Sequence, residues 1–384
     1  MPELFDREVH CLLGLPFDAI DMLGAIRRIR IAALRREPCF LSTPNLNWVV
    51  ACLTDVAFRD SVVRSDLSIV DGMPLIWISR LLDIPLRERV PGSGVFETLR
   101  SDEGGHLSVF FLGGQTGIAQ AACQQLNSAA GSMACVGFEC PGFGNVAEMS
   151  SDETIAKIND SGADFVVVAL GARKGQEWIE HNRHRLAAPI VSHLGAVVDF
   201  IAGSASRAPV WTQRAGLEWL WRIKERPSLW RRYFFDGLVL LRLLVTRVIP
   251  YAWFIRRNRP GRRALDYASA NMEDAEGASR IRIGGAWIEE NLGPLRKQFE
   301  KAAGNHKNIE LSMEASTYVD SAFVGLAMLL HAHQQQQGLQ LYFTSVPDHI
   351  ERVFRFCCAE YLLMTSPIVS PDSPPDISLA DRRD

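Results

Sequence analysis

Polar side chains that could take part in group transfer follow two apolar runs near the start of the chain. Thr43 and Asn45 come directly after the run Cys39–Leu41. Asp71 comes directly after the run Leu67–Val70. If both runs are parallel strands, these groups meet at the carboxyl edge of one sheet, where α/β folds bind ligands. A carboxylate there is a candidate general base. Capping of the following helix accounts for Asn45 or Asp71 equally well, so both interpretations stay open.

Two loops further along the chain contain glycine and could hold a phosphate or a sugar. Gly113 and Gly114 begin a Gly-Gly-x-x-Gly turn after an apolar run, and backbone N–H groups of such a turn can bind phosphate. Because the acidic Glu139 follows about 20 residues later, an NAD site is one alternative, and a plain tight turn is another. The second loop carries Gln176, with two cations before it, after the strongly apolar run Phe165–Leu170. Such a loop suits a nucleotide or a sugar, and a solvated surface loop is the alternative.

Motifs of several common chemistries are missing from the sequence. It has no Asp-x-Asp pair for a diphosphate-bound cation, no Walker A loop and no Gly-x-Ser-x-Gly elbow. We therefore predict neither a metal site nor a bound cofactor. The 384 residues are 47% hydrophobic and 22% charged, a globular composition with enough length for roughly two to three domains.

The net charge of −3 conceals one strongly basic segment. From Arg207 to Arg263 the chain has 14 basic and 3 acidic residues, interleaved with tryptophans. Within it, Phe234–Phe254 is mostly apolar, but Arg242 and Arg247 would each cost very roughly 2.5–3.5 kcal/mol inside a bilayer. A helix lying on an anionic membrane surface fits this pattern better than a spanning helix or a nucleic-acid site. A buried interdomain helix is the alternative.

The runs that deliver these side chains alternate with helical stretches, as in a layered α/β domain with a largely parallel sheet. The predicted strands are Cys39–Leu41, Leu67–Val70, Leu107–Leu112, Met133–Gly137, Phe165–Leu170 and Pro189–Ser192. The predicted helices are Ala19–Arg36, Leu46–Arg64, Pro74–Leu82, Thr116–Ala129, Asp152–Asn159 and Gly175–Leu186. A second, smaller unit has predicted strands Ile281–Ile283, Ile309–Met313 and Leu339–Thr344, and predicted helices Leu292–Ala303, Ser321–Gln336 and His349–Phe356.

These patterns divide the chain into five parts. We expect a Rossmann-like layered α/β domain over residues 1–206, a helical Trp/Arg-rich appendage over 207–258, a polar linker over 259–279, a small α/β domain over 280–365 and a disordered tail over 366–384. The eight cysteines form no Cys-x-x-Cys pair, so we predict reduced thiols, mostly in the core. No secretory signal pattern is evident at the start, which favours a cytoplasmic protein.

Taken together, the polar loops and the basic segment resemble one family, the WecG/TagA/CpsF glycosyltransferases of bacterial surface-polysaccharide synthesis. The resemblance runs from about Val9 to Arg232, and its motifs are Gly14-Leu-Pro-Phe-Asp, Thr43-Pro-Asn, Val70-Asp-Gly-Met-Pro, Arg87-Glu-Arg-Val-Pro-Gly, Phe111-Leu-Gly-Gly, Leu170-Gly-Ala-Arg-Lys-Gly-Gln-Glu-Trp-Ile, Gly195-Ala-Val-Val-Asp-Phe-Ile-Ala-Gly, Ala208-Pro-Val-Trp and Gly216-Leu-Glu-Trp-Leu-Trp-Arg. Relatives usually carry Pro-Lys before the Gln-Glu pair, where this chain has Arg173-Lys174-Gly175.

The resemblance implies an activity and a set of site residues. The family transfers a sugar, with inversion and without a required metal, from a UDP-sugar to a saccharide on polyprenyl diphosphate. Asp71 matches the position of the general base. Thr43, Asn45 and Gln176 match polar positions of the pocket, and the appendage residues Arg222, Arg231 and Arg232 match arginines that contact the UDP diphosphate. Guanidinium groups can stabilise such a leaving group in place of a metal.

The C-terminal unit resembles a STAS domain of the anti-sigma-factor-antagonist type. Tyr318-Val-Asp-Ser-Ala-Phe-Val-Gly-Leu lies where that family has an Asp-Ser-Ser-Gly loop, and Ser321 matches the serine that can be phosphorylated. Ala322 and Phe323 replace Ser and Gly of that loop. A regulatory switch and a purely structural or partner-docking domain are therefore equal alternatives.

We therefore expect a UDP-sugar glycosyltransferase that is peripheral on the inner face of the cell membrane. Its expected partners are the UDP-sugar donor, the polyprenyl-diphosphate acceptor, an anionic membrane surface and a STAS partner protein or kinase, and homo-oligomer formation stays open. The residues do not distinguish N-acetylmannosamine, its uronate or glucose as the sugar. An NAD-dependent oxidoreductase, or a non-catalytic STAS adaptor on an inactive transferase, are the alternatives.

Overall fold

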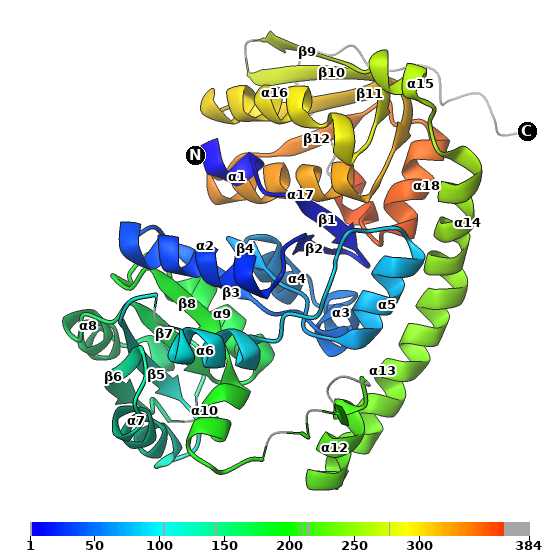
Figure 1. Ribbon diagram of the computed structural model, residues 1–384. Coiled ribbons are helices and arrows are strands. Elements are labelled where there is room, and N and C mark those ends of the chain that lie inside the picture. Colours follow the sequence, from blue (N-terminus) through cyan, green and yellow to red (C-terminus); the bar gives the residue numbers. More distant parts are fainter. Residues whose placement is uncertain are drawn as a thin grey trace, which may run out of the picture.

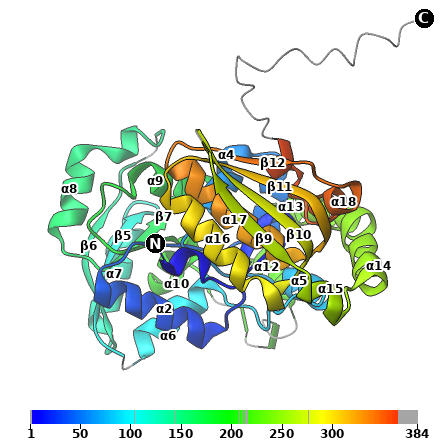
Figure 2. The same ribbon diagram turned by 90° about the horizontal axis from the view of Figure 1, so that it is seen from above.

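The protein consists of two α/β units that lie one above the other, with a long helix along one side of both (Figure 1). The computed structural model describes residues 2–102, 104–142, 144–206, 208–209, 211–212, 216–275 and 277–364. The predicted tail, 366–384, lies outside the described residues. Figure 2, seen from above, shows the C-terminal unit lying over the N-terminal one.

The N-terminal unit is built on a six-stranded sheet in which all neighbouring strands are parallel. In spatial order its strands are β4 (Leu67–Ser68), β3 (Cys39–Ser42), β8 (Ile190–His193), β7 (Phe165–Ala169), β5 (Leu107–Gly113) and β6 (Met133–Glu139). All six predicted strands are present, which confirms the prediction of a layered α/β fold.

Both faces of this sheet are covered by helices, and β5 shows how the sequence achieves this. Val109 and Phe111 pack into one core, whereas Phe110 and Leu112 pack into the other, since successive strand side chains point to opposite faces. The helices are α2 (Met22–Arg35), α3 (Leu46–Cys52), α4 (Val56–Val63), α5 (Met73–Leu81), α6 (Gly92–Ser101), α7 (Ile118–Ser128), α8 (Asp152–Asp160), α9 (Ala172–Asn182) and α10 (Gly195–Ile201), with a short turn η1 (Glu148–Ser150) before α8.

One predicted helix is divided in the structure. The stretch Leu46–Arg64 forms α3 and α4 rather than a single helix. Asp55 begins the second helix, because its carboxylate accepts a hydrogen bond from the backbone N–H of Phe58 at 3.0 Å. Aspartate competes with the helical backbone in this way and therefore favours a helix start over a helix interior.

The C-terminal unit contains a four-stranded sheet in the order β12 (Leu341–Thr344), β11 (Asn308–Val319), β10 (Ala278–Trp287), β9 (Ser269–Asp274). Its helices are α16 (Gly293–Gly304), α17 (Ser321–Gln336) and α18 (Asp348–Phe356), with short turns η4 (Glu289–Asn291) and η5 (Glu360–Met364).

The prediction of a linker over 259–279 was wrong in its second half. β9 pairs antiparallel with β10 there, and α15 (Arg262–Asp266) precedes it. β9 was not predicted because it is an edge strand with few apolar residues.

A hairpin near the start of the chain joins the two units. Its strands β1 (Val9–Leu12) and β2 (Leu15–Asp18) pair antiparallel, and neither was predicted. On one side, Asp18 accepts a hydrogen bond from the N–H of Ser68 in β4 at 2.7 Å and forms a buried ion pair with Arg7. On the other side, β1 packs against α17.

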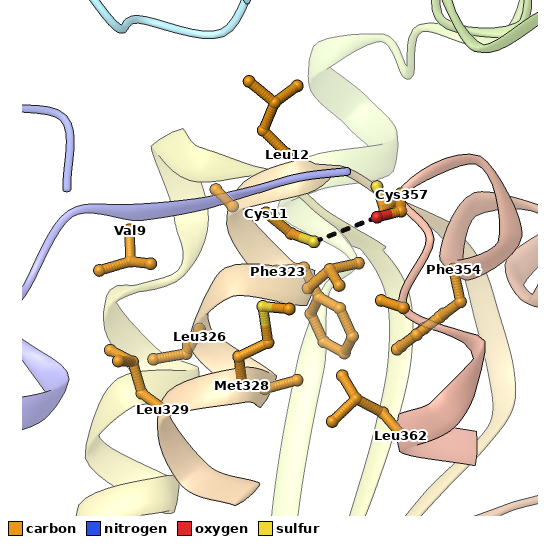
Figure 3. Packing of buried hydrophobic residues seen from close by; sticks show 14 of the residues in the cluster. Val9, Cys11, Leu12, Phe323, Leu326, Met328, Leu329, Phe354, Cys357 and Leu362 are labelled. Carbon is orange, nitrogen blue, oxygen red and sulfur yellow. Dashed lines mark hydrogen bonds between the residues drawn. The ribbon is translucent and has the colours of Figure 1, made fainter. Parts of the chain in front are cut away.

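The hairpin makes one continuous hydrophobic core out of parts of both units. Figure 3 shows Val9 and Cys11 of β1 among side chains of the C-terminal unit, including Phe323 and Leu326 of α17. The Cys11 thiol contacts the carbonyl of Cys357 at 3.5 Å. A short helix, α1 (Pro2–Phe5), packs against α16 and α17 next to it. The two units are therefore not independent bodies on a flexible tether.

The appendage forms α12 (Glu218–Glu225) and then a nearly continuous helix made of η2 (Pro227–Leu229), α13 (Trp230–Leu243), the π-helical turn η3 (Leu244–Val248) and α14 (Ile249–Asn258). The π turn lies directly before Pro250. Proline has no N–H to donate and its ring clashes with the carbonyl four residues earlier, so a widened turn relieves both problems.

One cysteine prediction was wrong. Cys123 of α7 and Cys135 of β6 form a disulfide, although they are separated by 12 residues and belong to no Cys-x-x-Cys motif. α7 packs on β6, and this packing brings the two thiols together. Cys11, Cys39, Cys52 and Cys357 are free and buried, as predicted, while Cys140 and Cys358 are partly exposed.

Candidate functional site

Three loops meet at the carboxyl edge of the large sheet and are held together by backbone hydrogen bonds. The N–H of Asp71, after β4, donates to the carbonyl of Pro44, after β3, at 2.9 Å. The N–H of Val90 donates to the carbonyl of Val70 at 2.8 Å and so adds the loop before α6. The prediction that the loops containing Thr43 and Asp71 meet at one sheet edge is therefore confirmed by the geometry.

The carboxyl group of Asp71 has an unusual environment. Burial raises its pKa from 3.8 to about 6, against the opposing effect of the cations Arg89 and Arg222 and of a backbone N–H from Gly92. Glu218 adds a smaller repulsion that also raises this pKa. A carboxylate with a pKa near 6 is ionised at neutral pH, yet holds a proton more strongly than an ordinary aspartate. Such a group is suited to general-base chemistry.

Arg89, Glu218 and Arg222 form a charged cluster beside Asp71. Glu218 bonds to Arg89 across 129 positions of sequence and to Arg222 at 3.0 Å within α12. Burial alone would raise the pKa of Glu218, but the two guanidinium groups more than offset it and lower that pKa. Arg222 was among the predicted site residues, whereas Arg89 and Glu218 were missed. The signal for both was present, since each lies inside a motif of the family resemblance.

The appendage closes over the Asp71 loop through small-residue packing as well as charge. Gly216, at φ +72°, lies so close to α5 that an added Cβ would come within 3.1 Å of Met73 and Trp77. The indole N–H of Trp221 is buried and has no hydrogen-bond partner among the residues that the structure describes. The first part of the appendage is therefore docked on the helix that starts directly after Asp71.

The other predicted pocket residues on this side lie deeper. Thr43 is buried, and Asn45 caps α3 by accepting a hydrogen bond from the N–H of Trp48 at 3.3 Å, so the capping interpretation of Asn45 is confirmed. Gln176 is completely buried in α9 and donates from Nε2 to Ser42 Oγ at 2.8 Å. Its carbonyl oxygen Oε1 has no partner in the described part of the protein.

Gly113 and Gly114 lie at the same edge of the sheet but four strands from β4. Both have φ near +90°, and the N–H of Gly114 donates to the carbonyl of Ala169 at 2.9 Å. A Cβ on Gly113 would lie 2.6 Å from the side chain of Leu170 and 2.9 Å from a backbone oxygen. Since strands are about 4.8 Å apart, this turn lies roughly 19 Å along the edge from β4. It therefore does not touch Asp71.

His193, at the end of β8, was not predicted. Burial lowers its pKa to about 4, so its imidazole is neutral, and Nδ1 is buried without a partner in the part of the chain that the structure describes. The ring lies 6.2 Å from that of Trp48 and directly against Gly175. A histidine at the carboxyl end of a strand, the edge where ligands bind, was the available signal.

Arg231 and Arg232 are exposed on α13 and are not part of the Asp71 cluster. The guanidinium of Arg231 lies 5.8 Å from the ring centre of Trp230, and that of Arg232 lies 5.0 Å from the ring centre of Tyr233. Asp236, one turn further on, is buried and accepts a hydrogen bond from Asn47 of α3 at 3.1 Å. This contact fixes one face of α13 to the sheet edge, while both arginines lie in solvent.

The outward face of the long helix carries a stripe of exposed apolar side chains at intervals of three or four residues. We call it the apolar stripe, and its members are Trp230, Phe234, Leu238, Leu241, Val245, Ile249 and Trp253, each at least 49% exposed. By length and composition alone, Pro227–Asn258 could cross a membrane, and only 22% of its most apolar window is buried. An amphipathic helix of this kind is suited to lie on a lipid surface.

The predicted regulatory residue, Ser321, is buried at the junction of the two units. Its hydroxyl lies 3.1 Å from Nδ1 of His10 in the hairpin, and it is 5% exposed. The preceding residue, Asp320, caps α17 by accepting hydrogen bonds from two backbone N–H groups at 2.9 Å. Glu289 completes the group at 3.7 Å from His10 Nε2. In this arrangement a kinase could not reach the Ser321 hydroxyl.

Similar proteins agree with this division of the chain. The sequence model of the glycosyl transferase WecG/TagA/CpsF family matches residues 10–252, and that of a Mlab-type STAS domain matches residues 271–360. Relatives include the N-acetylglucosaminyldiphosphoundecaprenol N-acetyl-beta-D-mannosaminyltransferases of Staphylococcus aureus strains NCTC 8325 / PS 47 and COL. Each is 26% identical over 214 residues, which cover 55% of this chain and 82% of the relative. The chain belongs to the WecG/TagA/CpsF family of glycosyltransferases and carries a STAS domain in its C-terminal part.

Proposed function

We propose that this protein transfers a sugar from a UDP-sugar to a saccharide on a polyprenyl-diphosphate carrier, with inversion and without a metal. N-acetylmannosamine is the first sugar to test and a lipid-linked N-acetylglucosamine the first acceptor, because the names of the relatives describe that reaction. The observation that carries the proposal is the Asp71 carboxyl group, with its pKa near 6, at the sheet edge beside Arg89 and Arg222.

In the proposed reaction Asp71 acts as the base. It takes the proton of the acceptor hydroxyl while that oxygen attacks the anomeric carbon, and the bond from this carbon to the UDP oxygen breaks. Arg222 neutralises the charge that develops on the leaving diphosphate, a role that a metal ion has in other transferases. Thr43 and Asn45 line the pocket on the β3 side.

Two other groups of predicted site residues enter the proposal differently. The turn at Gly113 and Gly114, far along the edge, is placed to hold another part of an extended donor such as UDP-sugar. The exposure of Arg231 and Arg232 favours contact with phosphate groups at the membrane, next to the apolar stripe.

The reaction is tested by measuring UDP release. Purified full-length protein is incubated with a panel of UDP-sugars and a short-chain lipid-linked N-acetylglucosamine. We expect UDP-N-acetylmannosamine to give acceptor-dependent release. Release that is independent of acceptor, or absent for every donor, would contradict the proposal. Binding of a nicotinamide dinucleotide in place of UDP would favour the oxidoreductase alternative.

Attachment to the membrane surface is tested by flotation with vesicles that contain anionic phospholipid. Leu238→Asp places a charge in the apolar stripe, and burial of a leucine side chain is worth about 1.5–3 kcal/mol, so we expect at least about tenfold weaker binding. Leu34→Asp is the matched control, because Leu34 is 86% exposed on α2, away from the stripe. Equal loss of binding in both variants would refute a specific role of the stripe.

A further inference from the structure

A cavity of about 840 Å³ lies where the N-terminal unit, the long helix and the STAS domain meet. From the N-terminal unit it is lined by the β1–β2 turn, the C-terminal end of α3 and Arg59. From the long helix it is lined by Val239, Arg242, Leu243, Thr246 and Arg247, and from the STAS side by Arg355, Cys358, Glu360 and Tyr361. Asn45 is at the opposite end of α3, so the cavity is separate from the Asp71 site.

The charge of the lining is strongly unbalanced. Four arginines, Arg59, Arg242, Arg247 and Arg355, are among the residues that line the cavity, and Glu360 is the one carboxylate among them. A wall with several arginines and one carboxylate attracts anions. This lining therefore favours an anionic ligand.

Three of the four guanidinium groups have protein partners. Arg247 bonds to Glu360 at 2.8 Å, and Arg355 bonds to Glu351 at 2.9 Å. Arg59 pairs with Asp60 at 3.1 Å and lies 3.6 Å from the ring centre of Tyr361. Of these contacts, Arg247 to Glu360 joins the long helix to the STAS side, and Arg59 to Tyr361 joins α4 to the STAS side.

Arg242 differs from the other three. Among the described residues its guanidinium has neither a hydrogen bond nor an ion pair. Its carbonyl accepts the hydroxyl of Thr246 at 2.8 Å, in the helix segment that runs into the π turn before Pro250. Arg242, Thr246 and Arg247 of this segment all line the cavity. π turns often occur at functional sites.

The rim of the cavity is apolar and continuous with the apolar stripe. Leu53 both lines the cavity and is 39% exposed. Leu241 and Val245 are neighbours of Arg242 and Thr246 on the helix and are 58% and 59% exposed. A ligand with an anionic head and an apolar tail would satisfy the cations inside and cover the apolar rim outside.

We propose that this cavity binds the phosphate group of an anionic lipid, with Arg242 as its principal contact. The site is distinct from the one that holds the sugar donor, and it places the headgroup against both the transferase unit and the STAS domain. Binding of such a lipid would therefore tie membrane attachment to the junction of the two units.

The test measures binding of soluble short-chain lipids to the full-length protein by calorimetry, with no sugar donor present. The probe is dihexanoyl phosphatidylglycerol below its micellar concentration, and inorganic pyrophosphate is the comparison for a free phosphate. We expect one lipid to bind per protein and Arg242→Gln to weaken it at least about tenfold, as for loss of a hydrogen bond to a charged group. Arg352→Gln is the control, since Arg352 is exposed on α18 and does not line the cavity.

The possible results separate the explanations. Equal weakening by Arg242→Gln and Arg352→Gln would show general charge attraction and overturn the site. An absence of lipid binding, or lipid binding that Arg242→Gln leaves unchanged, would also overturn the site. Pyrophosphate binding as tightly as the lipid would show that the ligand is a free phosphate compound and overturn the lipid assignment. Because no sugar transfer is measured, failure of the proposed enzymatic function would leave this result intact.

Discussion

Replacing Asp71 by asparagine should strongly slow sugar transfer and at the same time stabilise the protein. Asparagine keeps the shape and the acceptor oxygen of the side chain but cannot take a proton or carry a charge. The pKa of Asp71 is raised in the folded protein, from 3.8 to about 6. A raised carboxyl pKa means that ionisation opposes folding, so the cost is present above pH 6 and disappears as the pH falls toward 4.

The size of this effect follows from the pKa shift. At about 1.36 kcal/mol per pKa unit, the shift corresponds to roughly 3 kcal/mol as an upper limit. Since Asp71 is only partly buried and solvent reaches it, we expect about 1–2 kcal/mol of stabilisation for Asp71→Asn at pH 7.5. The same replacement should reduce the rate of UDP release by about 100-fold to 10,000-fold, the usual contribution of a general base. In the unsubstituted enzyme, the rate should fall as the pH drops below 6.

The assay is urea unfolding of both proteins at pH 7.5 and at pH 4.5, together with UDP release at pH 7.5. The difference in unfolding free energy should be largest at pH 7.5 and fall to about one third of that value at pH 4.5, close to the unfolded-state pKa of 3.8. An Asp71→Asn protein that is less stable at both pH values would show that the ionised carboxylate stabilises the fold through Arg89 and Arg222. That result, or unchanged UDP release, would refute the reasoning about the base.

Further replacements test three other parts of the structure. Arg222→Gln should lower the rate of UDP release by about 100-fold or more, whereas Arg231→Gln should change the rate with a soluble acceptor by less than about fivefold. Equal effects of the two replacements would contradict the proposal that Arg222, and not Arg231, contacts the leaving diphosphate. In urea unfolding, Ser321→Glu should lower the unfolding free energy by at least about 3 kcal/mol, because it buries a charge. Ser321→Ala should lower it by only about 1 kcal/mol, because it loses only the hydrogen bond to His10. A similarly small effect of the glutamate would refute tight packing of the two units around Ser321. Gly325→Ala should destabilise the protein although alanine has the better helix propensity, because the added Cβ would lie 2.3 Å from the carbonyl oxygen of Val9. An increase in stability would show that the hairpin does not pack against α17 at this position.

The sequence alone was sufficient for the architecture of the sheet. Apolar runs such as Phe165–Ala169 are short, rich in β-branched residues and bounded by polar loops, which is typical of buried parallel strands. Once such runs are strands of one parallel sheet, the polar residues that follow them must meet at its carboxyl edge. This rule is sufficient to predict Asp71 as a site residue.

Features that depend on contacts between distant segments were not predictable. The bond between Arg89 and Glu218 spans 129 positions, and nothing local in either segment indicates the other. The hairpin β1–β2 has strands of only four residues, and its role appears only when α17 packs on it. The disulfide between Cys123 and Cys135 likewise follows from the packing of α7 on β6.

The most direct test of the central claim is UDP release from UDP-N-acetylmannosamine with a lipid-linked N-acetylglucosamine acceptor, compared between the unsubstituted protein and Asp71→Asn. We expect acceptor-dependent release that the replacement reduces by at least about 100-fold, while the protein stays folded. Release that does not depend on Asp71, or no release from any UDP-sugar by a folded protein, would contradict it.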